Sequence, residues 1–249
     1  MTSDLFNSDG YQDRQKWDLG AWPEMYDRLK ELRMTVFTAE PGLQLNLMVF
    51  TIASQAAGCR HCTAHGAYGL ANFGVPIAKV QALWEFADSP MFSPRERAAL
   101  SFAAAAGSTP RHVTPEHHAE LRSHFSDAEV RTLLSAASIA GFMNTYNDSL
   151  ATVTDQASVD WASQYLAPLG WDVGKHVGQR HEQRLQGPPG TLTNTNQPSA
   201  ASPNRLDQTS CSSSPINIGA ITSAASMNVL SPHTWTDSPK RRWSSNALS

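Results

Sequence analysis

One stretch of the chain would be apolar on nearly every side if it formed a helix. It starts at Pro41, continues through LQLNLMVFTIASQAA and ends at Gly58. Leu, Met, Val and Phe recur in it at all phases of the 3.6-residue helical period, so hardly any face is left for water. Such a helix is stable only when other elements enclose it, and we therefore predict a buried helix here.

The segments on either side of this stretch carry helical signals of their own. Residues 23–37 place Met25, Leu29, Leu32 and Val36 on a helical spacing, with charged residues between them. In a capping box, a serine oxygen accepts one free N–H of the first turn and a glutamate three residues later accepts another. Helix starts of this or a similar kind occur at Ser93–Glu96, Thr114–Glu116 and Ser126–Glu129.

No segment has the alternating β-branched pattern, bounded by turns, that is typical of a strand. We therefore predict an all-α fold, with an N-terminal extension over residues 1–21, a helical domain over 22–176 and a tail over 177–249. More than half of residues 187–249 are Ser, Thr, Asn, Gln, Pro or Gly. Such a segment cannot bury enough apolar surface to offset an ordering cost of roughly 1–2 kcal/mol per residue, so we predict disorder there.

The charge of the chain gives no reason to expect a nucleic-acid or membrane partner. The 19 Lys and Arg residues nearly balance the 22 Asp and Glu residues, for a net charge of −3. The segment from residue 175 onward is weakly basic, but its charges are scattered. No signal peptide and no membrane-length apolar run is visible. We expect a cytoplasmic protein with neither partner.

Two of the three cysteines lie in the short stretch GCRHCTAHG, residues 58–66. Gly58 allows the chain to turn, so the next helix is predicted to begin near Cys59, where the helix N-terminus stabilises a thiolate. Cys62 lies one turn further, close enough to form a disulfide with Cys59. His65 follows at the same spacing, where a neutral imidazole could accept the thiol proton and an imidazolium would hold the thiolate.

Other interpretations of the stretch are less well supported. A zinc site needs four ligands, or three and a water, and no second CxxC or HxxxH motif completes the set. Covalent haem attachment needs a histidine directly after the second cysteine, where this chain has Thr63. A thioredoxin-type pair follows a strand, which is absent here. Two buried cysteines at a chance spacing remain an alternative. We expect no metal and no cofactor.

Several polar residues near this stretch are given ordinary roles by the sequence. His61 rotates away from the cysteines along a helix, so we expect it to face solvent or to tune the thiols slightly. The histidines at 117, 118 and 124 lie among charged residues and are interpreted as surface residues. Asn144 and Asn147 close the long helix that begins after Ser126, and we interpret them as C-terminal polar residues rather than as part of a cysteine pocket.

The cysteine stretch and its surroundings resemble the carboxymuconolactone decarboxylase and alkylhydroperoxidase D-like proteins. The resemblance is carried by FTIASQAAGCRHCTAHGAYGLANFGVPIAKVQALWEF, FSPRERAALSFAAAAG, GFMNTYNDSLAT and YLAPLGWDVGKH. It covers residues 20–176 and implies an alkylhydroperoxidase D-like helical bundle that forms homo-oligomers. It also implies peroxidase or disulfide-reductase chemistry on a hydroperoxide or another small molecule, with an external dithiol as reductant.

The resemblance also assigns roles within the motif. Cys62, the cysteine nearer the histidine, is implied to attack the peroxide and become a sulfenic acid; Cys59 resolves it to a disulfide, and His65 is the base. The peroxidase prototype has its histidine one residue further on, and it carries a glutamate where this chain has Leu47. Glu40 and Glu85 are our candidates for a substitute acid.

The sequence therefore predicts a thiol-dependent hydroperoxide reductase with a peroxiredoxin-like, antioxidant activity. Two alternatives remain open. The pocket could bind or transform a small ring compound, such as a lactone, with the cysteines as a redox sensor; family members that decarboxylate lactones generally lack the cysteine pair. The chain could also be an interaction protein whose function lies in its tail.

Overall fold

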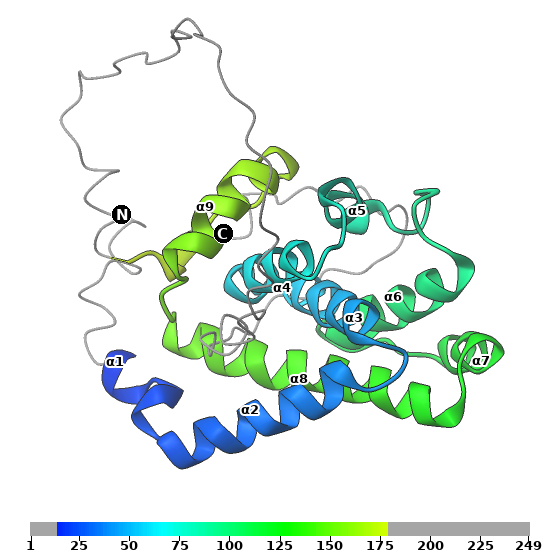
Figure 1. The fold of residues 1–249 in the computed structure, drawn as a ribbon, viewed down its shortest axis with the longest axis horizontal. Helices are drawn as coiled ribbons and strands as arrows, with labels where there is room; N and C mark the ends of the chain where they lie inside the picture. The colour runs from blue at the N-terminus through cyan, green and yellow to red at the C-terminus, as the bar shows by residue number, and fades with distance from the viewer. Residues whose placement is uncertain (1–13, 179–249) are drawn as a thin grey trace, which may run out of the picture.

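The computed structural model describes residues 14–178, and every regular element within this range is a helix (Figure 1). The absence of strands from these residues confirms the predicted all-α fold class. The elements, in chain order, are α1 (Arg14–Trp17), η3 (Leu19–Ala21), α2 (Pro23–Thr38), α3 (Leu43–Ala56), α4 (Arg60–Asn72), α5 (Ile77–Ala82), η4 (Leu83–Glu85), α6 (Pro94–Gly107), α7 (Pro115–His124), α8 (Asp127–Leu150), α9 (Gln156–Tyr165), η5 (Ala167–Leu169) and η6 (Gly174–His176).

Helix α3 forms the centre of the molecule, as its all-round apolar character predicts. Residues 45–54 are all buried, and the helix packs against α4, α6 and α8. At its contact with α6, a β-carbon on Gly107 would lie 2.2 Å from the carbonyl oxygen of Ala53. Only glycine permits two helices to approach this closely, so Gly107 sets the distance between α3 and α6.

The predicted capping boxes are confirmed at the starts of α6 and α8. The carboxylates of Glu96 and Glu129 each accept the backbone N–H of the capping serine at 2.8 Å. The third start is also confirmed, since α7 begins at Pro115, although there the Nδ1 atom of His117 accepts the Thr114 N–H at 3.2 Å. Local capping chemistry therefore determines where three of these helices begin.

The long helix α8 crosses the molecule, with α2 packed beside it (Figure 1). After α8, the chain turns at Ala151, whose φ of 48° is left-handed, and returns as α9. Helix α9 and η6 then contact α4, so the first turn of α4 is enclosed by the segment that follows α8.

The predicted domain limits stay predictions. Part of the predicted N-terminal extension forms α1 and η3, and the Arg14 side chain donates a hydrogen bond to the Ala151 carbonyl at 3.0 Å. The tail predicted from residue 177, including its Cys211, lies outside the described residues beyond position 178. Between residues 14 and 178, no helix is both long and apolar enough to cross a bilayer.

Candidate active site

The two cysteines of the motif lie at the first turn of α4. Gly58 has a φ of 79°, a left-handed conformation that glycine adopts without strain, and it turns the chain from α3 into α4. Cys59 is the N-cap of α4, and its sulfur accepts the backbone N–H of Cys62 at 3.2 Å. The predicted helix start is therefore confirmed, with a sulfur in the capping position that an oxygen usually takes.

Both cysteines are in the thiol form and almost completely buried, with exposures of 0% for Cys59 and 2% for Cys62. Burial raises the pKa of the Cys62 thiol well above its usual range, and its hydrogen bond to the Cys59 side chain and the nearby charges of Cys59 and Asp148 raise it further. By contrast, the backbone N–H that reaches the Cys59 sulfur stabilises negative charge there. Burial therefore opposes a thiolate on Cys62, and any group that stabilises one must lie close to its sulfur.

Helix α8 contributes a hydrogen-bond donor to the Cys62 sulfur. The side-chain amide of Asn147 donates to this sulfur at 3.1 Å, and Asn147 is fully buried. The interpretation of Asn147 as a C-terminal polar residue that is not part of a cysteine pocket is therefore wrong. Its position in the last turn of α8 carries no local signal of this contact, because the contact depends on how α8 crosses α4.

His65 lies one turn after Cys62 but bonds neither cysteine. Its Nδ1 is 2.9 Å from the carbonyl oxygen of His61, and its Nε2 is 2.5 Å from the carboxylate of Asp155. Both partners are acceptors, so a neutral ring can donate to only one of them, whereas an imidazolium can donate to both. Of the two roles that the spacing allows, this arrangement supports the positively charged ring near the thiols.

The acid that faces His65 is Asp155, the N-cap of α9. Burial alone would raise the pKa of this carboxyl, but hydrogen bonds from His65 and Ser158, together with the charge of His65, hold it well below its usual range. The expected substitutes Glu40 and Glu85 are both exposed, and neither makes a described contact with His65. Leu47 is 2% exposed and belongs to the apolar core.

His61 is buried, contrary to the expectation that it faces solvent. Its exposure is 1%, and its Nδ1 lies 3.0 Å from the hydroxyl of Thr154. Its ring centroid lies 4.2 Å from that of His65 and 5.4 Å from that of His176. Burial and the charges of these two rings lower the pKa of His61 well below its usual range. His61 is therefore a neutral ring between two other histidines.

A second ionic cluster lies on the other side of His61. The buried carboxylate of Asp148 accepts from the Nε2 atom of His176 at 3.1 Å and also pairs with Lys175. The Nδ1 of His176 lies 2.9 Å from the carbonyl oxygen of Thr152. In the described part of the chain, no group of three or more Cys, His, Asp or Glu side chains is arranged to hold a metal ion.

Comparison with protein families gives a match to the carboxymuconolactone decarboxylase family over residues 23–105. The match covers about a third of the chain. The matched segment runs from α2 to near the end of α6 and contains the cysteine motif, which agrees with the resemblance that the sequence carries. Asn147 and Asp155, which contact the motif from α8 and α9, lie outside the matched segment. No curated protein matches the sequence.

Among solved structures, the chain is similar to the debrominase Bmp8. One structure is of the apo protein and another is of a cysteine-to-alanine variant in complex with 2,3,4-tribromopyrrole. Each gives a TM-score of 0.55 and 25% sequence identity and covers 66% of this chain; the match covers 95% of the apo chain and 94% of the variant chain. The family name and this neighbour therefore stand for two different enzymatic activities, a decarboxylation and a debromination.

A more distant similarity involves a protein of unknown function from Agrobacterium tumefaciens, proposed to be the antioxidant defence protein AhpD. It has a TM-score of 0.46 and 21% identity, and the match covers 49% of this chain and 84% of that one. This likeness is too distant to bear on the activity of the chain.

Proposed function

We propose that the chain is a thiol-dependent reductase in which Cys59 and Cys62 cycle between a dithiol and a disulfide, with a hydroperoxide as the substrate. The observation that carries the proposal is the position of two thiols one turn apart at the start of α4, each sulfur accepting an N–H. Such donors lower the cost of negative charge on sulfur, and a thiolate is the form that attacks.

In the proposed reaction, the Cys62 sulfur attacks the peroxide and the Cys59 sulfur resolves the sulfenic acid that forms. The pair first loses one proton to solvent, and the remaining proton lies on Cys59, which is hydrogen-bonded to Cys62, when the Cys62 thiolate forms. The Cys62 thiolate attacks one peroxide oxygen, the O–O bond breaks, and the departing alkoxide takes the proton from Cys59. The Cys59 thiolate then attacks the sulfenic acid, a hydroxide leaves and is protonated to water, and the disulfide forms. An external dithiol supplies the two electrons that restore the pair.

His65 and Asn147 assist this step without reacting. The amide N–H of Asn147 offsets the burial that disfavours a thiolate on Cys62. A protonated His65, held by Asp155, would add a positive charge on the same flank of α4. In this proposal His65 supports the thiolate through its charge, and Asp155 takes the place of the glutamate that the family's peroxidase prototype carries at the Leu47 position.

The first test follows the two cysteines by mass spectrometry while reduced protein is treated with hydrogen peroxide or an organic hydroperoxide. We expect the peptide that contains both cysteines to lose two hydrogen atoms, to recover them with dithiothreitol, and to react faster than Cys211. Cys62→Ser should abolish peroxide turnover, whereas Cys59→Ser should stop at a sulfenic acid or a mixed disulfide. Unchanged peroxide consumption by Cys62→Ser would refute the proposal.

A second pair of variants tests the role of the His65 charge. Asp155→Asn removes the carboxylate charge while asparagine remains a good N-cap for α9, so the fold is retained. We expect this variant to oxidise about tenfold more slowly, the effect of one charge-assisted hydrogen bond. Asp160→Asn, an exposed substitution on the same helix, is the matched control and should oxidise at the wild-type rate. Equal rates for both variants would remove His65 from the proposal.

The similarity to Bmp8 supports a second candidate substrate, a brominated aromatic ring. A dithiol can also reduce a carbon–bromine bond: bromide leaves, a hydrogen takes its place on the ring, and the two thiols become a disulfide. The same variants distinguish the substrates when 2,3,4-tribromopyrrole is the probe and released bromide is measured. Bromide release that exceeds peroxide turnover, and that needs both cysteines, would favour debromination.

A further inference from the structure

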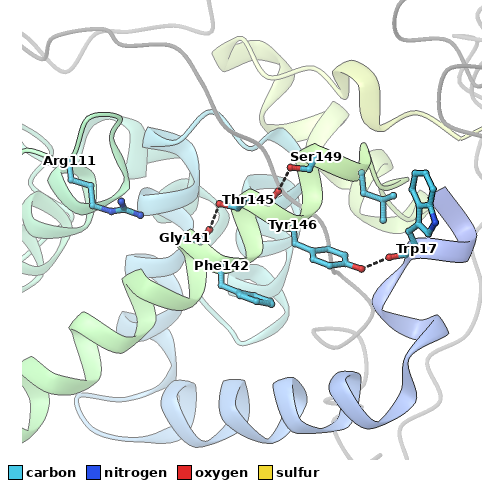
Figure 2. A pocket seen from close by; sticks show the side chains of 8 residues that line it. Trp17, Arg111, Gly141, Phe142, Thr145, Tyr146 and Ser149 are labelled. Carbon is cyan, nitrogen blue, oxygen red and sulfur yellow. Dashed lines mark hydrogen bonds between the residues drawn. The ribbon is translucent and has the colours of Figure 1, made fainter. Parts of the chain in front are cut away.

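The outer face of α8 carries a pocket that the cysteine chemistry does not use (Figure 2). Its volume is about 640 Å³, within the range of small-molecule sites in proteins. The lining residues are Trp17, Arg111, Gly141, Phe142, Thr145, Tyr146, Ser149 and Leu150. Asn147 and Asp148, which face Cys62 and His176, lie on the opposite side of the same helix. The pocket is therefore separate from the candidate active site.

The walls of the pocket are mainly apolar and aromatic. Phe142 and Tyr146 lie one turn apart on α8, with their rings inclined by 19° and their centroids 6.3 Å apart. Trp17 lies at one end of the row, and Arg111 lies at the other end beside Gly141 (Figure 2). The row from Gly141 to Leu150 spans ten residues of helix, or about 14 Å. A flat molecule of one or two rings fits this length.

Most of the polar side chains that line the pocket already make hydrogen bonds within the protein. The hydroxyls of Thr145 and Ser149 donate to carbonyl oxygens one turn earlier, and the Tyr146 hydroxyl donates to the Trp17 carbonyl. The Arg111 guanidinium makes no hydrogen bond or ion pair with any residue between 14 and 178, and no acidic residue lines the pocket. The aromatic wall of the pocket therefore has an exposed guanidinium at one end, and no carboxylate lines the pocket opposite this cation.

We propose that this pocket binds an aromatic monocarboxylate. Arg111 offers two parallel N–H groups, the geometry that a carboxylate accepts in a bidentate pair. The aromatic row supplies the apolar surface against which the ring of the ligand lies. One end of the pocket carries the positive charge of Arg111, and the other end is apolar. The pocket therefore fits a ligand with a negative charge at one end and an apolar ring at the other, and it excludes cations and neutral polar molecules.

The probe for this proposal is 2-naphthoate, with 2-naphthamide as its neutral counterpart, and binding to the full chain is measured by isothermal titration calorimetry. We expect 2-naphthoate to bind with a dissociation constant below about 1 mM and at least tenfold more tightly than the amide. Arg111→Gln should weaken 2-naphthoate binding about tenfold or more and leave amide binding unchanged. Arg131→Gln, an exposed substitution on α8 outside the pocket, is the matched control.

A second variant locates the site. Thr145→Phe fills the middle of the row from an exposed position and should abolish binding of both probes, while circular dichroism reports an unchanged helical fold. Retained binding by Thr145→Phe would overturn the proposal, because the probe would then lie elsewhere. Equal affinities for acid and amide, or no binding of 2-naphthoate by the wild type, would overturn it as well. Cys62→Ser should bind 2-naphthoate as the wild type does.

Discussion

The two sides of helix α4 differ in how they are held. One side packs on α3 through small and apolar residues; a β-carbon on Gly66 would lie 2.3 Å from the hydroxyl oxygen of Thr51. The other side faces the start of α9 through polar groups, with His61 bonded to Thr154 and His65 bonded to Asp155, the N-cap of α9. The cysteine turn lies between these two environments.

The two sides of α4 therefore control different properties of the cysteine sulfurs: one controls their position and the other their charge. Close-packed interiors tolerate no change of volume, so the α3 side fixes where the two sulfurs lie. Hydrogen bonds and ion pairs respond to protonation, so the α9 side determines how much charge the sulfurs can carry. Substitutions on the α3 side should therefore change stability at every pH, whereas substitutions on the α9 side should change how stability and thiol chemistry depend on pH.

The largest effect should come from a charge placed on the apolar side. Leu47→Glu would bury a carboxylate at a position that is 2% exposed, and His65 already has Asp155 as its acid. We expect the free energy of unfolding to fall by more than about 3 kcal/mol, as measured by urea denaturation.

The matched control for this substitution is Leu32→Glu, since Leu32 is 51% exposed on α2. Its effect on the free energy of unfolding should stay within about 0.5 kcal/mol. A stable Leu47→Glu protein with faster thiol oxidation would show instead that the position faces the site and that the relay of the family's peroxidase prototype can be rebuilt there.

A smaller effect is expected from one methyl group at the contact between α3 and α4. Gly66→Ala forces the buried Thr51 side chain to move and should cost about 1–3 kcal/mol, even though alanine favours the helix. The cost should shrink in a Thr51→Ala background, because the clashing hydroxyl is then gone. Equal costs in both backgrounds, in the same denaturation experiment, would mean that the α3 side is not closely packed.

The α3 side of this comparison is the part that the sequence predicts well. The apolar run over residues 43–56, the capping serines and the turn at Gly58 are local signals, and they predict the buried helix, three helix starts and the position of Cys59 at the N-terminus of α4. Local patterns suffice there because helix limits depend on capping chemistry and burial on periodicity.

The α9 side could not be predicted in the same way. Asp155 is 90 residues from His65 along the chain, and Asn147 is 85 residues from Cys62. Both contacts arise from how α8 and α9 cross α4, and no local pattern encodes a crossing angle. Asp155 does have a local role as the N-cap of α9, and that role gives no sign of its ion pair. The burial of His61 depends in the same way on the segment that folds back over it.

The smallest effect concerns His61 and appears only as a pH dependence. Its pKa is lowered in the folded protein, so below the ordinary histidine pKa of about 6.5 the unfolded chain binds a proton that the folded protein does not. The stability that a neutral His61 permits is therefore complete above this pH and is lost as the pH falls toward the folded value. The slope for one proton is about 1.4 kcal/mol per pH unit.

Urea denaturation of the wild type and of His61→Asn between pH 7.5 and 5 measures this slope directly. Asparagine can still donate to Thr154 near the position of Nδ1, but it does not titrate. On acidification, the free energy of unfolding of the variant should therefore fall less steeply than that of the wild type, and the difference in slope should correspond to about one bound proton. His118→Asn, on α7, controls for the removal of a histidine elsewhere and should keep the wild-type slope. Parallel curves for the wild type and His61→Asn would mean that His61 is protonated in the folded protein, and the polar side of α4 would then carry one more positive charge beside the thiols.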